Sequence, residues 1–451
     1  MLLYDRQAIS STGFWLENSR QKILWGVELD LILKMKLTYV LLLAVALTVQ
    51  TGYGADNTNS SADTKAVISN AGRMKALRKE VDDAEAAYMK AIEDRKPKDQ
   101  IDKLWNVYLQ IDDTNLAKIF ELARQEPASE TACEMFGWIV ANPKTKGGPL
   151  NSIGVQSVEF LRDYHATDSN IAKICWEFGT PYWDPTFQPA TDFLQMAADN
   201  NPDHEVQGQA ILALARRNKR NAGNIILFSE SAPSGDARFN KLRMAYLERA
   251  KNANPETLSR EAEKLFNLVL DKYADCPTLE RTNTPQFKAT LGEVAKAELY
   301  DLNHLSVGKE APEIEGEDID GKKLKLSDYR GKVVMLSFWA SWCGPCMGMV
   351  PSEVKLAERM KGKPFALVGV NGDCIRNDAK RAVEKEKMTW PSFWNKEGPD
   401  GPIPTAWNVH GWPAVYVLDP NGIIRFKGED INLVNQKIDQ ILGQFSDKAR
   451  T

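Results

Sequence analysis

The feature that most constrains this chain is a pair of cysteines, Cys343 and Cys346, separated by two residues. The pair follows an apolar run, Val333 to Trp339, and opens a segment with helical periodicity, so we expect it at a strand-to-helix junction. A helix N-terminus presents unpaired N–H groups and partial positive charge, which favour a thiolate over a thiol. Because the thiolate is the nucleophile of disulfide exchange, the pattern predicts a redox-active dithiol.

A Cys-x-x-Cys pair can also be half of a zinc site or a purely structural disulfide. A structural zinc site needs four ligands, whereas the other cysteines are scattered singly and the four histidines lie far apart. A disulfide that closes a two-residue loop constrains the unfolded chain very little. The sequence therefore predicts no metal ion and no cofactor other than the disulfide itself.

The surroundings of the dithiol resemble the active-site segment of the thioredoxin superfamily. Residues 338–346 spell FWASWCGPC, and Pro351 matches the proline that kinks the first long helix of that family. Gly411-Trp412-Pro413 resembles the cis-proline loop of the family. The sequence cannot show the isomer of that peptide bond, although a cis X-Pro bond is uncommon enough to imply a purpose.

The segment before the dithiol resembles the extracytoplasmic branch of the superfamily, the TlpA-like and ResA-like thiol–disulfide oxidoreductases. Ala311-Pro312, Asp320 to Lys323 and Leu326 to Lys332 carry this likeness to its N-terminal hairpin. The resemblance covers residues 306–446 and implies an α/β domain with a central mixed sheet flanked by helices. It implies that Cys343 attacks the substrate and Cys346 resolves the mixed disulfide.

The resemblance also implies a substrate-binding edge formed by Trp342, Trp412 and Pro413, with the Trp412 backbone pairing with an incoming peptide. The patterns of the residues agree with this fold. Short apolar runs at 333–339 and 365–370 are typical of a parallel sheet. Helices are expected at 349–361, 378–387 and 431–442, and a hairpin joins 414–418 to 423–427 through the turn Asp419 to Gly422.

Two departures from the family leave the proton acceptor of the second thiol open. Many thioredoxins have a buried aspartate where this chain has Ser337, and ResA-like proteins often have a glutamate where it has Met349. Glu353, one helical turn further, is one candidate acceptor, although glutamates on helices are commonly exposed. His410 is a second candidate, although a lone loop histidine is usually solvated. Water is a third.

The remaining cysteines have open assignments. Cys374 follows the second apolar run and is expected on the same sheet edge as the dithiol, as a third redox thiol or, in the simpler interpretation, a small buried or half-buried hydrophobe. Cys133 and Cys175 could pair in an oxidising compartment, and the sequence gives no partner for Cys276.

The N-terminus has the pattern of a secretory signal peptide. An uncharged run, Leu37 to Thr48, follows Lys34-Met35-Lys36 and precedes Gly52 to Ala55, and it is too short to span a membrane. We therefore expect residues 1–34 to be an upstream mis-called start, 35–54 a signal peptide and 55–64 a disordered lead-in. The alternative is an uncleaved anchor. Cleavage predicts a periplasmic or extracytoplasmic protein without stable membrane insertion.

Residues 65–305 are expected to form a large all-α domain, with residues 447–451 as a tail after the second domain. Helices are expected at 65–94, 116–124, 130–141, 152–164, 205–218, 240–253, 258–273 and 285–302. Residues 261–277 loosely resemble the second helix of a tetratricopeptide unit, but no 34-residue period is present, so a helical repeat and an irregular bundle remain alternatives. The aromatic cluster Trp176, Phe178, Tyr182, Trp183 and Phe187 favours core packing over a peptide groove.

Composition narrows the partners. The chain of 451 residues has a net charge of −4 with both signs interspersed, which gives no reason to expect nucleic acid. The leading hypothesis is an extracytoplasmic oxidoreductase that reduces or exchanges disulfides of client proteins and receives electrons from a membrane donor. The alternatives are a helical binding or scaffold protein with a docking thioredoxin-like module, and a disulfide isomerase.

Overall fold

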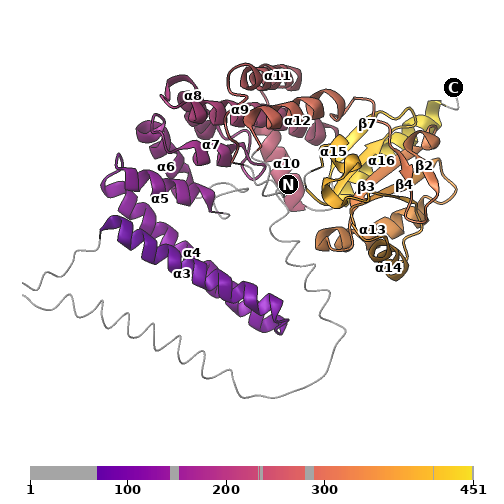
Figure 1. The fold of residues 1–451 in the computed structure, drawn as a ribbon, viewed down its shortest axis with the longest axis horizontal. Helices are drawn as coiled ribbons and strands as arrows, with labels where there is room; N and C mark the ends of the chain where they lie inside the picture. The colour runs from indigo at the N-terminus through magenta and orange to yellow at the C-terminus, as the bar shows by residue number, and fades with distance from the viewer. Residues whose placement is uncertain are drawn as a thin grey trace, which may run out of the picture.

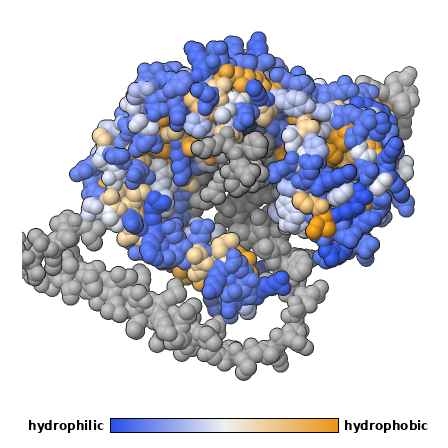
Figure 2. Space-filling model, in the orientation of Figure 1, coloured by the Kyte–Doolittle hydropathy of each residue, from blue (hydrophilic) through white to orange (hydrophobic). Residues whose placement is uncertain are grey.

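The computed structural model describes residues 69–142, 152–231, 233, 237–279, 289–409 and 411–448. Our expectations for residues 1–64, for His410 and for the chain after residue 448 lie outside these ranges. Within them, an α-helical region and an α/β domain lie side by side, and the α3–α4 hairpin projects from the helical region (Figure 1). Hydrophilic residues cover most of the face shown in Figure 2.

The region before residue 305 is built mainly from helices. They are α3 (Asn70–Glu93), α4 (Lys98–Gln125), α5 (Glu130–Ala141), α6 (Ser152–Phe160), a π-helix (Leu161–His165), α7 (Ala172–Gly179), α8 (Gln188–Asn200), α9 (His204–Glu230), α10 (Ala237–Arg249), α11 (Pro255–Lys272) and α12 (Leu291–His304). The mostly helical character predicted for this region is confirmed. The described α-helices of this region range from 8 to 28 residues, and the likeness to a repeat stays a prediction.

Local signals explain where several of these helices begin. The side chain of Asn254 accepts a hydrogen bond from the Thr257 N–H, and Pro255 occupies the first helical turn of α11, where its missing N–H does no harm. Thr290 and Glu293 form a reciprocal capping box at the start of α12. The helices α7 and α8, which we did not predict, are short and lack a side-chain cap, so they depend on packing against α9.

The aromatic cluster lies mainly in the core of the helical region, as predicted. Phe178 and Trp183 are fully buried with their ring centroids 4.7 Å apart, whereas Tyr182 is exposed. Cys133 and Cys175 are both buried in this core as free thiols, so the disulfide that we considered between them is absent. Burial raises the pKa of the Cys133 thiol to about 12, which keeps it protonated and inert.

The C-terminal domain has the mixed sheet that the resemblance implied. Its elements are β1 (Glu315–Glu317), β2 (Lys323–Lys325), β3 (Val333–Trp339), α13 (Gly344–Arg359), β4 (Phe365–Asn371), α14 (Arg376–Glu386), β5 (Ser392–Trp394), α15 (Pro402–Ala406), β6 (Ala414–Leu418), β7 (Ile424–Gly428) and α16 (Ile431–Lys448). The sheet order is β5-β4-β3-β6-β7; β4 runs parallel to β3, and β6 runs antiparallel to it. The strands β1 and β2 form a separate antiparallel hairpin.

The central strand β3 is buried along its whole length, because helices cover one face of the sheet and loop residues the other. Val350 and Leu356 of α13 and Ile438 of α16 belong to one apolar cluster, and Trp407 and Tyr416 to the other. The predicted β6–β7 hairpin turns at Gly422, whose φ of 80° favours glycine. Because β3 is buried along its whole length, its C-terminal end is held rigidly, and so is the dithiol that follows it.

A buried ionic cluster joins the two regions. Asp301 of α12 bonds both Lys219 of α9, at 2.5 Å, and Lys427 of β7. Lys437 of α16 pairs with Glu230 of α9 at 2.8 Å, and apolar residues of α9 and α10 also pack against the C-terminal core. The two regions are thus docked through paired charges, which fixes their relative orientation. None of the helices in the described ranges has the length and apolarity to cross a bilayer.

Candidate active site

The two cysteines of the motif lie at the junction of β3 and α13, as the sequence pattern predicts. They form a disulfide with their Cα atoms 5.3 Å apart. Cys343 is the N-cap residue of α13, and its Sγ accepts a hydrogen bond of 3.2 Å from the Cys346 N–H. Cys346 lies deeper, 1% exposed against 5% for Cys343. An N–H donor aimed at Sγ of Cys343 stabilises negative charge on that sulfur when the disulfide is reduced.

Two tryptophans, the exposed Trp342 and the half-buried Trp412, lie beside a cis peptide bond whose proline, Pro413, is buried. The Trp412–Pro413 bond is cis, the form that the sequence could not establish. The ring of Trp412 lies 6.1 Å from that of Trp342, which is 56% exposed. A Cβ added at Gly372 would approach the Trp412 ring to 2.6 Å, so only glycine lets the loop after β4 pass so close. The site therefore has an apolar edge open to solvent.

Beneath the dithiol, Glu353 is a buried carboxyl group rather than the exposed glutamate that its helical position suggested. It is 2% exposed, and the Ser337 hydroxyl of β3 donates a 2.7 Å hydrogen bond to its Oε1. Burial raises the pKa of Glu353 to about 7, although the Ser337 bond acts in the opposite direction. Ser337, which stands where many thioredoxins have an aspartate, thus bonds a carboxyl group that α13 supplies.

Glu353 follows Cys346 by seven residues on α13, which places both on the same face of the helix, two turns apart. Side chains of a helix lean toward its N-terminus, so the Glu353 carboxyl leans toward the dithiol. The sequence analysis named Glu353 as a candidate acceptor but did not predict that it is buried. Its burial could have been predicted from the apolar residues Val350 and Leu356, which lie on the same face of the helix.

The loop after β4 lies at the same edge, as expected for a strand parallel to β3. Asp373 of this loop accepts hydrogen bonds from the backbone N–H of Ser341, at 3.0 Å, and from the Ser341 hydroxyl, at 2.6 Å. Cys374, the next residue, is exposed, so the simpler interpretation of a buried small hydrophobe is wrong. Sequence reasoning missed Asp373, although its place after a parallel strand could have identified it.

Two further candidate sites carry less chemistry. The sulfur of Cys133 and polar atoms of His165 and Asp168 lie within 4.8 Å of one another. The His165 ring already bonds Asp168 at Nδ1 and the Pro127 carbonyl at Nε2, both at 2.7 Å, so both of its ring nitrogens have partners within the protein.

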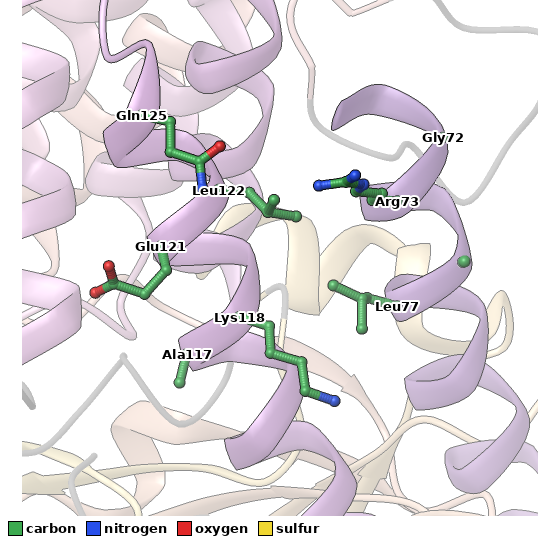
Figure 3. A pocket seen from close by; sticks show the side chains of 9 residues that line it. Gly72, Arg73, Leu77, Ala117, Lys118, Glu121, Leu122 and Gln125 are labelled. Atoms are coloured by element: carbon green, nitrogen blue, oxygen red, sulfur yellow. The ribbon is translucent and has the colours of Figure 1, made fainter. Parts of the chain in front are cut away.

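The second is an apolar groove of about 640 Å³ between α3 and α4, shown in Figure 3. It is lined by Gly72, Arg73, Ala76, Leu77, Ala117, Lys118, Glu121, Leu122 and Gln125. The lining contains no thiol, histidine or paired carboxylates, so the groove offers no group for covalent or acid–base chemistry.

The fold and this site together define a protein of the thioredoxin superfamily. The AhpC/TSA family matches residues 307–427. The thioredoxin-like protein YneN of Bacillus subtilis is 33% identical over 26% of this chain and 68% of its own length. The thiol-disulfide oxidoreductase ResA of Bacillus thuringiensis is 32% identical over 28% of this chain and 72% of its own length.

A solved structure of a putative thiol:disulfide interchange protein DsbE from Chlorobium tepidum is also similar. It is 31% identical, covers 31% of this chain and 99% of its own, and has a TM-score of 0.29. On the sequence relatives, the chain belongs to the TlpA/ResA-like thiol–disulfide oxidoreductases through its C-terminal domain. This membership supports a redox function for that domain, to which the residues matched by the family model belong.

Proposed function

We propose that this protein is an extracytoplasmic thiol–disulfide oxidoreductase that reduces disulfides in client proteins. The observation that carries the proposal is the Cys343–Cys346 disulfide at the N-terminus of α13, beside the solvent-open tryptophan edge. Family membership supports the chemistry. The predicted signal peptide supports the location, and the Gly-Pro pair between the cysteines, which is that of reducing thioredoxins, supports the direction.

The reaction begins with the dithiol reduced. The Cys343 thiolate attacks one sulfur of a client disulfide; that disulfide breaks, and its other sulfur leaves as a thiolate that takes up a proton. Cys346 then loses its proton and attacks Sγ of Cys343, which forms the Cys343–Cys346 disulfide and releases the second client thiolate. Two electrons have passed to the client. The cycle restarts when a membrane donor, carrying two electrons, reduces the disulfide.

Glu353 is the proton acceptor for Cys346 in this scheme. Its pKa of about 7 leaves a large fraction of the carboxyl ionised near neutral pH, so it can take a proton and release it again. Two helical turns, about 11 Å along the axis, separate the residues, so a water molecule or the Ser337 hydroxyl must carry the proton part of the way. His410 remains the alternative acceptor.

Client recognition belongs to the edge formed by Trp342, Trp412 and Pro413. An exposed ring at Trp342 offers apolar contact to any extended segment, and the backbone at Trp412 offers hydrogen bonds, so the edge suits varied protein clients. The broad nature of these contacts agrees with a reductase of proteins rather than of one small molecule.

The test is reduction of insulin by dithiothreitol, comparing the wild type with Cys343→Ser and with a matched control, Cys374→Ser. We expect the wild type and the control to accelerate insulin precipitation and Cys343→Ser to give the uncatalysed rate. A Cys346→Ser variant should accumulate a mixed disulfide with the client, because the resolving thiol is missing.

Equal rates for the wild type and Cys343→Ser would remove the enzymatic proposal and favour a helical scaffold with a docking module. If the protein accelerates the refolding of a substrate with scrambled disulfides more than it accelerates the reduction of insulin, it is instead an isomerase. Both results are read on the full chain, so the helical region is present in every comparison.

A further inference from the structure

Asp373 lies at the centre of a buried polar network that reaches the active-site segment. Its Oδ2 accepts a hydrogen bond of 2.7 Å from the side chain of Asn371, and the Asn371 Oδ1 accepts the Asp373 N–H at 3.1 Å. Both bonds to Ser341 end on the same carboxylate. Asp373 is 2% exposed, so these neutral donors replace the water that would otherwise solvate it.

The loop that carries Asp373 is fixed on several sides. The Trp394 indole donates a 3.0 Å hydrogen bond to the Asp373 carbonyl, and the Arg376 guanidinium stacks 4.0 Å above the Trp394 ring. The Gly372 N–H donates to the carbonyl of Trp339, the last residue of β3. The loop therefore cannot carry Asp373 away from Ser341 without breaking backbone contacts to β3 and β5.

The carboxylate has no cationic partner in the part of the chain that the structure describes: no lysine, arginine or histidine there forms an ion pair with Asp373. The groups that bond its two oxygens are uncharged: the Ser341 N–H and hydroxyl and the Asn371 side-chain amide. Ser341 precedes Cys343 by two residues, and two residues span at most about 7 Å, so the charge lies near the reactive sulfur. Charges at such separations in a protein interact measurably, and salt screens them little when one is buried.

A negative charge beside a thiolate destabilises it. The buried titratable groups of α13 are Cys346 and, two helical turns further along the helix, Glu353. On the loop side, the exposed Cys374 and the half-buried Arg376 follow Asp373, and Arg376 pairs with Glu317. The helix N-terminus and the Cys346 N–H favour the thiolate, whereas Asp373 opposes it. Because a dithiol becomes more reducing as its reduced form is destabilised, this opposition favours electron transfer from the dithiol to a client.

We propose that Asp373 is a positioning residue that holds the segment before the dithiol through Ser341 and, by its unpaired charge, limits the stability of the Cys343 thiolate, which keeps the protein reducing. The inference rests on the proposed function for its meaning in the cell. The electrostatic effect on Cys343 stands independently of any client.

The experiment measures the pKa of Cys343 from the pH dependence of its alkylation by iodoacetamide, on the reduced full chain with Cys374→Ser as background. Asp373→Asn should lower this pKa by about half a unit, a threefold change in thiolate population. The same factor in the equilibrium with glutathione raises the reduction potential by about 15 mV. The exposed Asp400 provides the control, since Asp400→Asn removes an equal charge from the same domain.

Ser341→Ala separates charge from mere loosening of the loop. It removes a hydrogen bond that neutralises the carboxylate but keeps the charge, so it should raise the Cys343 pKa, opposite to Asp373→Asn. If Asp373→Asn fails to fold, this variant decides alone. An unchanged or raised pKa in Asp373→Asn, or one that does not rise in Ser341→Ala, would overturn the proposal.

The two proposals fail separately. If the wild type reduces insulin but Asp373→Asn leaves the pKa of Cys343 unchanged, only the role of Asp373 is refuted. A wild type that does not accelerate insulin reduction, yet whose Cys343 pKa responds as expected, refutes the proposed function and leaves the electrostatic inference intact.

Discussion

Replacement of Glu353 by glutamine tests the buried carboxyl beneath the dithiol. Glutamine keeps an oxygen that can accept the Ser337 hydrogen bond but cannot ionise. In the folded chain the pKa of Glu353 is about 7, against 4.5 for an unperturbed glutamate. The difference is about 2.5 pKa units, and each unit corresponds to about 1.4 kcal/mol, so the ionised form is disfavoured by roughly 3 kcal/mol on folding.

The sign follows from the direction of the shift. A carboxyl whose pKa is raised by folding binds its proton more tightly in the folded state, so its contribution is full below pH 4.5. That contribution is lost as the pH rises from 4.5 to about 7, where the unfolded chain ionises freely and the folded chain does not. The free energy of unfolding of Glu353→Gln, measured relative to that of the wild type, should therefore increase by about 3 kcal/mol between pH 4.5 and pH 8.

The assay is urea unfolding of the oxidised full chain at pH 4.5, 6, 7 and 8, followed by tryptophan fluorescence. The matched control is Glu358→Gln, which removes a carboxylate from the exposed side of the same helix and should change little with pH. Parallel pH dependences for the wild type and Glu353→Gln would refute the reasoning, because they would mean that Glu353 ionises as an ordinary exposed glutamate.

Three further predictions follow from single contacts. Ser337→Ala removes the hydrogen bond that opposes the shift, so the midpoint of the pH-dependent stability should move above that of the wild type in the same urea series; a downward move would contradict this. Asp301→Ala removes the carboxylate that bonds both Lys219 and Lys427, so the free energy that couples the two regions should fall by about 2–3 kcal/mol. Calorimetry should then show two separate unfolding transitions in place of one. A single unshifted transition would exclude the ionic cluster as the source of the coupling. Cys374 should react with a thiol reagent in the native oxidised chain, and its modification should leave insulin reduction unchanged; a loss of insulin reduction would identify a third redox thiol.

Much of the C-terminal domain was accessible from the sequence because its signals are local. The bounds of β3 and β6 agree with those expected, since a run of consecutive apolar residues flanked by polar ones has little freedom. The short β5 and α15 were missed because three to five residues carry too weak a pattern. In the helical region, α5 was predicted with the correct bounds, whereas α9 extends twelve residues beyond the predicted end at 218.

The extension of α9 has a tertiary cause. Its last turns contain Leu227 and Glu230, which contact the C-terminal domain, and no sequence window reveals a surface that another domain will supply. The disulfide considered between Cys133 and Cys175 is also absent, because both are buried as free thiols in the helical core.

The sequence by itself determined the dithiol, its place at a strand-to-helix junction and the family of the domain, because these depend on spacing along a few consecutive residues. Only the tertiary structure decided what surrounds the two sulfurs. Ser337 and Glu353 lie sixteen residues apart, and Ser341 and Asp373 thirty-two. Both pairs meet only when β3 is enclosed by α13 and β4, and burial then turns an ordinary glutamate into a carboxyl group with a pKa near neutrality.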